Sequence, residues 1–165
     1  MAYYSRTTTG ATNLTKFTLS FWLKRGDNDT GIHQVWSLGS QTSNEGYCQI
    51  RFNDDNGGAT FRVSMHDGGS DGLNLFSKKK LMDSQWYHFV LRLEMGNSSA
   101  NKVRAYMNGD EMEWDTSPSR TYFTASSLAS TFFTGGTNGN INIINAARDG
   151  SQSGDHHYAE MYFVD

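Results

Sequence analysis

The sequence predicts an all-β protein built as a single antiparallel β-sandwich, and three observations carry that prediction. Apolar and polar residues alternate with a period of two in segments along the whole chain. Turn residues separate these segments, since the 165 residues include 17 glycines but one proline. Aromatic residues make up 13% of a chain that is only 36% hydrophobic, and such rings suit the gap between two packed sheets.

The clearest hairpin signal lies in the middle of the chain. Trp86–Met95 is a long strand led by aromatic residues, and Lys102–Met107 returns after the polar loop Gly96–Asn101. Asn108 and Gly109 follow, and this dipeptide supplies the positive φ angles that a two-residue type I′ turn requires. The chain must reverse there, so one hairpin leads directly into another.

The remaining strands are predicted from the same alternation. No window shows a convincing period of 3.6 residues, and residues 126–130 could form one helical turn at most. Ten or so short strands in a domain of this size indicate a sandwich or a barrel. Besides the central pair, the predicted strands are residues 17–25, 34–38, 47–53, 60–66, 73–76, 131–134, 141–144 and 157–164.

The core is predicted from the apolar side of each strand. Cys48 alternates with core positions of its strand, which indicates a buried and unreactive thiol rather than a nucleophile. As the only cysteine, it excludes an internal disulfide. The predicted core residues are Phe17, Leu19, Phe21, Leu23, Ile50, Phe52, Phe61, Val63, Leu91, Leu93, Val103, Ala105, Met161 and Phe163.

Length and charge limit the possible classes of protein. A chain of 165 residues with no linker or repeat predicts one domain over residues 1–165. The net charge of -3 argues against nucleic acid as a partner, because nucleic-acid binding needs a basic face. Lys78–Lys80 is the only cationic run, and we expect it to be a solvated loop.

Residues 1–9 lack a signal-peptide pattern and no apolar run reaches membrane-spanning length, so we expect a soluble protein made in a cytoplasm.

Four segments, in order and spacing, resemble the laminin-G-like branch of the concanavalin A-like lectin/glucanase superfamily. They are Leu19–Arg25, Trp86–His88, Val103–Gly109 and Tyr158–Asp165. The last of them, with the opening Tyr3–Arg6, also resembles tail and appendage proteins of bacteriophages. The resemblance implies a jelly-roll sandwich of two curved antiparallel sheets, with the terminal strands close together. It further implies binding of glycan or protein on the concave face or at the loop rim.

Some members of this superfamily are retaining glucanases, which carry a characteristic pattern of carboxylates on one strand. Glu111, Glu113 and Asp115 superficially fit a strand that aims alternate carboxylates into one cleft. They begin directly after the Asn108–Gly109 turn, however, where the family has an ordinary hairpin return. We therefore expect a solvated strand edge here and a protein that is not an enzyme.

Two loops supply oxygen ligands that suit Ca²⁺. The turn Asp54–Gly58 and the turn Gly68–Gly72 are rich in Asp, Asn and Gly. No defined ligand spacing is present, and the same residues form turns for conformational reasons alone. If a cation binds, Asp54, Asp55 and Asp71 are its predicted ligands, on the expectation that successive hairpins return their turns to the same rim.

Aromatic side chains opposite the core face suggest a surface on which sugars stack. Trp22 and Trp114 are the predicted stacking residues. Covering of such rings by loops or by a neighbouring subunit is the alternative. His88 is expected to pack or hydrogen-bond inside the sandwich. The aromatic residues considered for this surface are Trp22, Trp36, Trp114, Tyr122, Tyr158 and Tyr162.

Together these features predict a non-enzymatic structural and binding module of a virion, such as a phage tail or capsid appendage. Its expected partners are other virion proteins, further copies of itself in a homo-oligomer such as a trimer, and a cell-surface glycan. Neither nucleic acid nor membrane insertion is expected. The alternative of a different class is a free carbohydrate-binding lectin, with or without Ca²⁺, and a glucanase is the third.

Overall fold

The fold is an antiparallel β-sandwich, as predicted. The computed structural model describes residues 4–5, 15–26, 32–39, 46–54, 59–66, 72–81, 84–98, 101–115, 142–144 and 156–164. Within these ranges, sheet A consists of β1 (Tyr4–Ser5), β10 (Asn142–Ile144), β3 (Ile32–Gly39), β4 (Tyr47–Asp54), β5 (Ala59–His66) and β6 (Gly72–Leu81), in that order. Sheet B consists of β11 (His156–Val164), β2 (Lys16–Arg25), β7 (Trp86–Glu94), β8 (Val103–Met107) and β9 (Asp110–Glu111).

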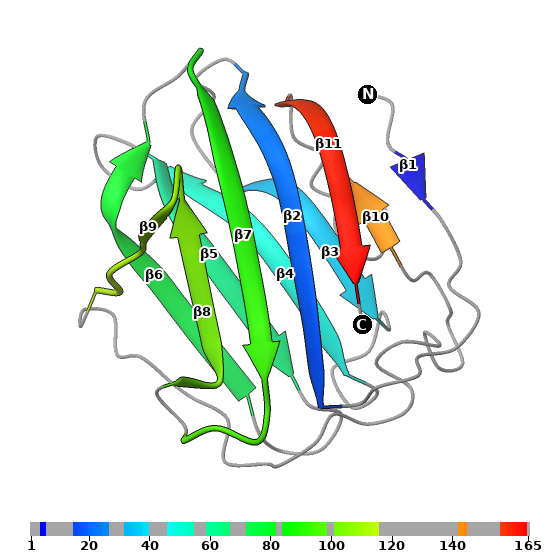
Figure 1. Cartoon of the computed structure of the whole chain (residues 1–165). Helices are drawn as coiled ribbons and strands as arrows, with labels where there is room; N and C mark the ends of the chain where they lie inside the picture. The colour runs from blue at the N-terminus through cyan, green and yellow to red at the C-terminus, as the bar shows by residue number, and fades with distance from the viewer. Residues whose placement is uncertain are drawn as a thin grey trace.

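The two sheets lie face to face, with sheet B in front of sheet A in Figure 1. The first long strand, β2, pairs with the last strand, β11, and Tyr158 lies opposite Leu23. This pairing confirms that strands from the two ends of the chain lie side by side. The two-residue β1, however, belongs to the other sheet. β11 carries a bulge between Ala159 and Tyr162, where Glu160 has a φ of 50°.

The predicted turn at the end of β8 has the predicted conformation. Asn108 has a φ of 54° and Gly109 a φ of 92°, the two positive values of a type I′ turn. The Asn108 side chain also stabilises the neighbouring strand, because the backbone N–H of His88 donates to its Oδ1 at 2.8 Å.

The core lies between the sheets and is made of the alternate residues predicted for it. Most of these side chains are fully buried, whereas Met161 and Phe163 are partly buried and pack against the others. Phe61 of sheet A stacks on Phe89 of sheet B with 4.6 Å between ring centroids, so aromatic rings join the two layers. Cys48 is buried as predicted, and burial raises the pKa of its thiol.

Trp36 belongs to the core, and its place among the exposed aromatic residues was wrong. It is 0% exposed, and its ring stacks with that of Phe163 across the sandwich at 6.2 Å. The physical reason is that residues two apart on a strand share a face. Leu38 is buried, so Trp36 must point to the same side.

β6 is longer than the predicted strand 73–76 and contains the lysine run that was expected to be a solvated loop. The residues that follow β9 form backbone hydrogen bonds with the edge of β6 and so extend this strand. The N–H of Lys78 donates to the Glu113 carbonyl at 3.0 Å, and that of Asp115 donates to the Phe76 carbonyl at 2.7 Å. Residues 113–115 therefore cross from sheet B to the edge of sheet A. We call them the crossing segment.

Three predicted features fall outside the described residues: the strand 131–134, the helical turn 126–130 and the ring of Tyr122. In the parts of the chain that the structure describes, no helix is long and apolar enough to cross a membrane.

Candidate functional site

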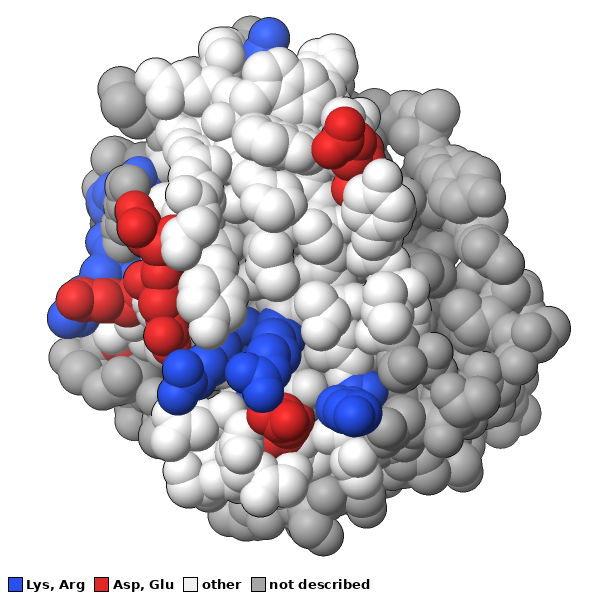
Figure 2. Space-filling model, viewed as in Figure 1, with Lys and Arg blue, Asp and Glu red and all other residues white. Residues whose placement is uncertain are grey.

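The outer face of sheet B is arranged by the register of β11, β2 and β7. Residues directly paired across antiparallel strands lie side by side, and those that alternate with core positions point outward. Trp22 thus lies between Ala159 and His88, and Trp86 lies one row further along, opposite Lys24. Figure 2 shows this face: charged side chains gather toward the lower left, and the centre is largely uncharged.

A shallow depression of about 460 Å³ lies on this face. It is lined by Trp22, Trp86, Ala159 and Glu160. Trp22 is 36% exposed and Trp86 is 46% exposed, so solvent reaches both indole rings. Ala159 is paired with Trp22, and because its side chain is small it leaves one side of the Trp22 indole open. We call this site the aromatic depression.

Polar groups stand around the aromatic depression. The bulge in β11 holds Glu160 at a positive φ on its border, a conformation that is uncommon for a residue other than glycine. Among the described residues, Glu160 makes no ion pair. Next to Trp22, His88 Nε2 lies 2.9 Å from Ser20 Oγ. Exposed ring faces beside a carboxylate and a hydroxyl can bind a ligand that is apolar on one face and carries hydroxyl groups at its edge.

His88 lies on the outer face, and the prediction that it packs inside the sandwich was wrong. Its ring lies against that of Trp22 with 5.0 Å between centroids. The alternation of β7 explains this position, because Tyr87 and Phe89 on either side are buried. His88 therefore supports Trp22 from the side and helps to set the orientation of the indole.

The charged part of the same face is an array of ion pairs. Arg92 pairs with Glu94, and Arg104 Nη1 lies 3.5 Å from Glu111 Oε2. The Nδ2 group of Asn97 donates to Glu94 Oε2 at 2.7 Å. Exposed pairs of this kind neutralise one another and contribute little to stability, so this region resembles an ordinary solvated surface.

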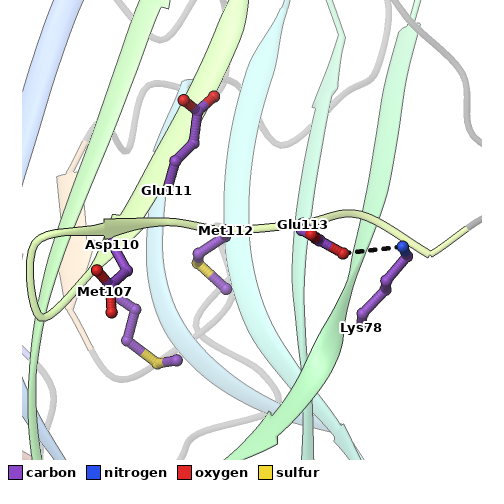
Figure 3. A pocket seen from close by; sticks show the side chains of 6 residues that line it. All are labelled: Lys78, Met107, Asp110, Glu111, Met112 and Glu113. Carbon is purple, nitrogen blue, oxygen red and sulfur yellow. Dashed lines mark hydrogen bonds and ion pairs between the residues drawn. The ribbon is translucent and has the colours of Figure 1, made fainter.

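The carboxylates considered for glucanase chemistry do not face each other. Glu111 and Glu113 border a pocket of about 290 Å³ that Met107 and Met112 also line, and Asp115 is not part of its lining. Figure 3 shows Glu111 pointing away from Glu113, which turns toward Lys78. The Glu113 carboxylate accepts a hydrogen bond from Lys78 Nζ at 2.9 Å, and this bond lowers its pKa. A general acid of a glycosidase needs a raised pKa.

Trp114 does not join Trp22. It lies in the crossing segment, pairs with Ser77 of β6, and is partly buried against the core. The sequence missed Trp86 as the second exposed indole, although its place two residues before His88 on a strand puts both on the same face.

The described residues that flank the two predicted calcium loops lie at opposite ends of β5. Ala59 pairs with Asp54 at one end of β5, and His66 pairs with Gly72 at the other. At about 3.3 Å per residue, those ends lie roughly 23 Å apart, so the register argues against one site that includes both Asp54 and Asp71. Consecutive hairpins turn at alternate ends of a sheet, and for this reason the register argues against the expected common rim. The side chains of Asp54, Asp55 and Asp71 lie outside the described residues, and a Ca²⁺ site at any of them stays a prediction.

The remaining titratable groups that the structure describes form no metal site. Among the residues that the structure describes, no group of three or more His, Cys, Asp or Glu could hold a metal ion. Tyr158 is expected from the sequence to be a surface aromatic, but its hydroxyl donates to the Val35 carbonyl at 2.8 Å across the sandwich. Burial raises the pKa of this phenol well above its ordinary value.

The chain belongs to the concanavalin A-like lectin/glucanases superfamily, whose family model matches residues 2–152. The match confirms the resemblance to this superfamily and covers every described strand except β11. Comparison with curated proteins finds no similar sequence.

Solved structures show the same fold at low sequence identity. Mouse laminin alpha1 chain, domains LG4-5, aligns with a TM-score of 0.65 and 7% identity over 98% of this chain and 39% of that chain. The CBM40 of Ruminococcus gnavus IT-sialidase bound to alpha2,3 sialyllactose has a TM-score of 0.61 and 11% identity, over 92% of this chain and 76% of that one. Tailspike protein 2 of bacteriophage CBA120 has a TM-score of 0.60 and 17% identity, over 98% of this chain and 23% of the tailspike.

Proposed function

We propose that the chain is a non-enzymatic carbohydrate-binding module and that a sugar stacks in the aromatic depression. The observation that carries this proposal is the pair of solvent-exposed indoles, Trp22 and Trp86, beside the carboxylate of Glu160. A pyranose ring has an apolar face that fits against an indole and hydroxyl groups at its edge that a carboxylate accepts. The similarity to carbohydrate-binding structures of the same fold supports this assignment.

The depression is shallow, which sets the kind of affinity to expect. Deep pockets bury most of a ligand, whereas an open platform buries one ring face. We therefore expect micromolar to millimolar affinity for one sugar unit and tighter binding when several modules act together.

The absence of catalysis is part of the proposal. Glu160 stands alone on the depression, and Glu111 and Glu113 each engage a different cation. Hydrolysis with retention needs two carboxyl groups about 5 Å apart, one of them with a raised pKa. We expect no release of reducing sugar from β-glucans by the purified chain.

We further propose that the module works in a virion, as part of a phage tail or capsid appendage. The similarity to a phage tailspike supports this, as does the resemblance of the closing strand to appendage proteins. The chain spans 23% of that tailspike, so a module within a larger assembly is the natural role. Such modules form symmetric homo-oligomers, and we expect a trimer.

Binding is tested on a glycan array, followed by calorimetry with the oligosaccharide that binds. We expect Trp22→Ala to weaken binding at least tenfold and Val164→Ala to leave it unchanged. Val164 is a matched control because it is exposed on the same face but lies away from the depression. An array without any binding, or equal affinity of Trp22→Ala and the unchanged chain, would contradict the proposal. A parallel array with EDTA reports whether binding needs Ca²⁺.

Assembly is tested separately by analytical ultracentrifugation. A trimer supports the appendage role. A monomer at high concentration that still binds glycan would favour the alternative, a free lectin.

A further inference from the structure

Three exposed aromatic side chains lie on one diagonal across the outer face of sheet B. In the strand order β11, β2, β7, Trp22 belongs to the middle strand. On one side of it, Trp86 of β7 is paired with Lys24, two residues further along β2. On the other side, Tyr162 of β11 is paired with Ser20, two residues back along β2. Each step from one ring to the next therefore moves one strand across the sheet and two residues along it, in a constant direction.

The spacing of these residues follows from sheet geometry. Diagonal neighbours of this kind lie about 7–8 Å apart, so the three residues extend over about 15 Å. Tyr162 lies beyond the aromatic depression, which Trp22 and Trp86 line. A ligand that covers all three rings must therefore be an extended chain, because one sugar ring is too short.

Exposure sets these three rings apart from the other aromatic side chains. Tyr162 is 62% exposed, more than either indole. Among the described residues, the other large hydrophobic side chains with comparable exposure are Ile32 and Val164, and neither is aromatic. Every aromatic side chain that the described part of the chain exposes to this degree thus belongs to the diagonal. A contiguous set of exposed apolar groups with polar neighbours is typical of a binding surface. We call these three residues the aromatic line.

The bulge in β11 directs Tyr162 to this face. Ala159 and Tyr162 are paired with residues of β2 that are only two apart, so β11 carries one extra residue between them. In a regular strand, the outward residue after Ala159 would be Met161. The bulge instead leaves Met161 packed against the core and Tyr162 exposed. Bulges re-aim side chains in this way next to binding sites, and here the strained residue is Glu160 with its positive φ.

The polar groups beside the aromatic line suit a neutral ligand. Glu160 is the one charged residue that lines the aromatic depression, and Ser20 is paired directly with Tyr162. The centre of this face is largely uncharged (Figure 2). A sugar hydroxyl can donate to the carboxylate, whereas an acidic sugar would meet it as a like charge.

We propose that the aromatic line binds one linear, neutral oligosaccharide of β-1,4-linked pyranoses, which lies flat across β7, β2 and β11. This inference rests on the proposed function and adds the class of its ligand. A β-1,4 linkage between equatorial positions gives a straight, flat chain whose ring faces are apolar, so successive rings can stack along a straight line of aromatic side chains. An α-1,4 linkage makes the chain curve away from such a line. Tyr162 holds the end of the chain and determines the preferred chain length.

The test is calorimetric titration of the full chain with cellobiose, cellotetraose and maltotetraose. We expect cellotetraose to bind about tenfold more tightly than the other two, because only a straight chain longer than a disaccharide reaches all three rings. Tyr162→Ala should lower the affinity for cellotetraose about tenfold, to the value for cellobiose.

Two control variants separate stacking from other effects. Val164→Ala should bind cellotetraose fully, since Val164 is exposed on the same strand and face but lies one row beyond the aromatic line. Tyr162→Phe keeps the ring and should also bind fully. Tyr162→Ala should melt at the same temperature as the unchanged chain, as is usual at an exposed position, so its loss of binding is not a loss of fold.

The outcomes that overturn the inference differ from those that overturn the proposed function. Full affinity of Tyr162→Ala for cellotetraose overturns the inference, and so does equal affinity of the unchanged chain for cellobiose or maltotetraose and for cellotetraose. Failure of cellotetraose to bind overturns it as well. In each of these cases the proposed function stands if Trp22→Ala loses binding to a glycan found on the array. A change in sedimentation of Tyr162→Ala with full binding would instead assign Tyr162 to a contact between copies.

Discussion

Tryptophan illustrates how one residue type serves two purposes in this molecule. Trp36 and Trp22 lie on strands of different sheets, and the first points inward and the second outward. The inner ring fills the space between the sheets, where packing is dense. The outer ring rests on His88 and remains open to solvent on its other side.

The two residues should differ sharply in their effect on stability. Trp36→Ala should lower the free energy of unfolding by about 3–5 kcal/mol, because a large buried ring leaves a cavity. Trp22→Ala should lower it by less than about 1 kcal/mol, as is usual at surfaces. Urea unfolding followed by circular dichroism measures both. Similar losses in the two variants would show that Trp22 is part of the core.

Cys48 should be unreactive in the folded chain. The thiolate is the reactive form, and burial raises the pKa of this thiol. A thiol-specific reagent at pH 8 should therefore leave the native protein unmodified and label it fully in denaturant. Rapid labelling without denaturant would mean that β4 opens easily.

What the sequence could reveal about single residues depended on the length of the alternating pattern. The run from Phe17 to Leu23 assigned four core positions and left Trp22 outside, as the structure has it. The strand around Trp36 is interrupted by a register shift between Gln34 and Trp36, and a short interrupted run gives alternation little weight.

At the scale of elements, the turn after β8 is where backbone conformation matters most. Gly109 has a φ of 92° and open space where a Cβ would be, so a side chain there meets conformational strain alone. Gly109→Ala should lower the free energy of unfolding by about 1–2 kcal/mol. Gly96→Ala is the control, since Gly96 also has open space and no positive φ, and it should be nearly neutral. Equal effects would contradict a type I′ turn.

The strand pairings also show why β6 was predicted too short. Its local sequence becomes polar after Phe76, and its partner there is the crossing segment, which is more than thirty residues away. A pattern read within a window of ten residues contains nothing of such a contact. The pairing of β5 likewise bears on the predicted calcium site, since the strands that flank its two loops are joined at opposite ends of β5.

For the whole molecule, acid should weaken the contact between the crossing segment and β6. The pKa of Glu113 is lowered in the folded state, so its contribution is present above the unfolded pKa and is lost as the pH falls through the folded value. The pair is exposed, so the effect is small. Glu113→Gln should melt slightly below the unchanged chain at pH 7, and the difference should vanish in acid and in 1 M salt. A difference that persists in acid would indicate another cause.

The crossing segment has a consequence for how copies of the chain can meet. The exposed edge of a sheet is a template on which a second chain can add a strand, and this is a common route to aggregation. Along Phe76–Lys78, the chain satisfies the edge of β6 with its own residues 113–115. A neighbouring copy therefore finds the Lys78 N–H and the Phe76 carbonyl already bonded. Copies of the chain that touch this stretch are therefore held there mainly by side chains, and they can meet without their sheets joining edge to edge.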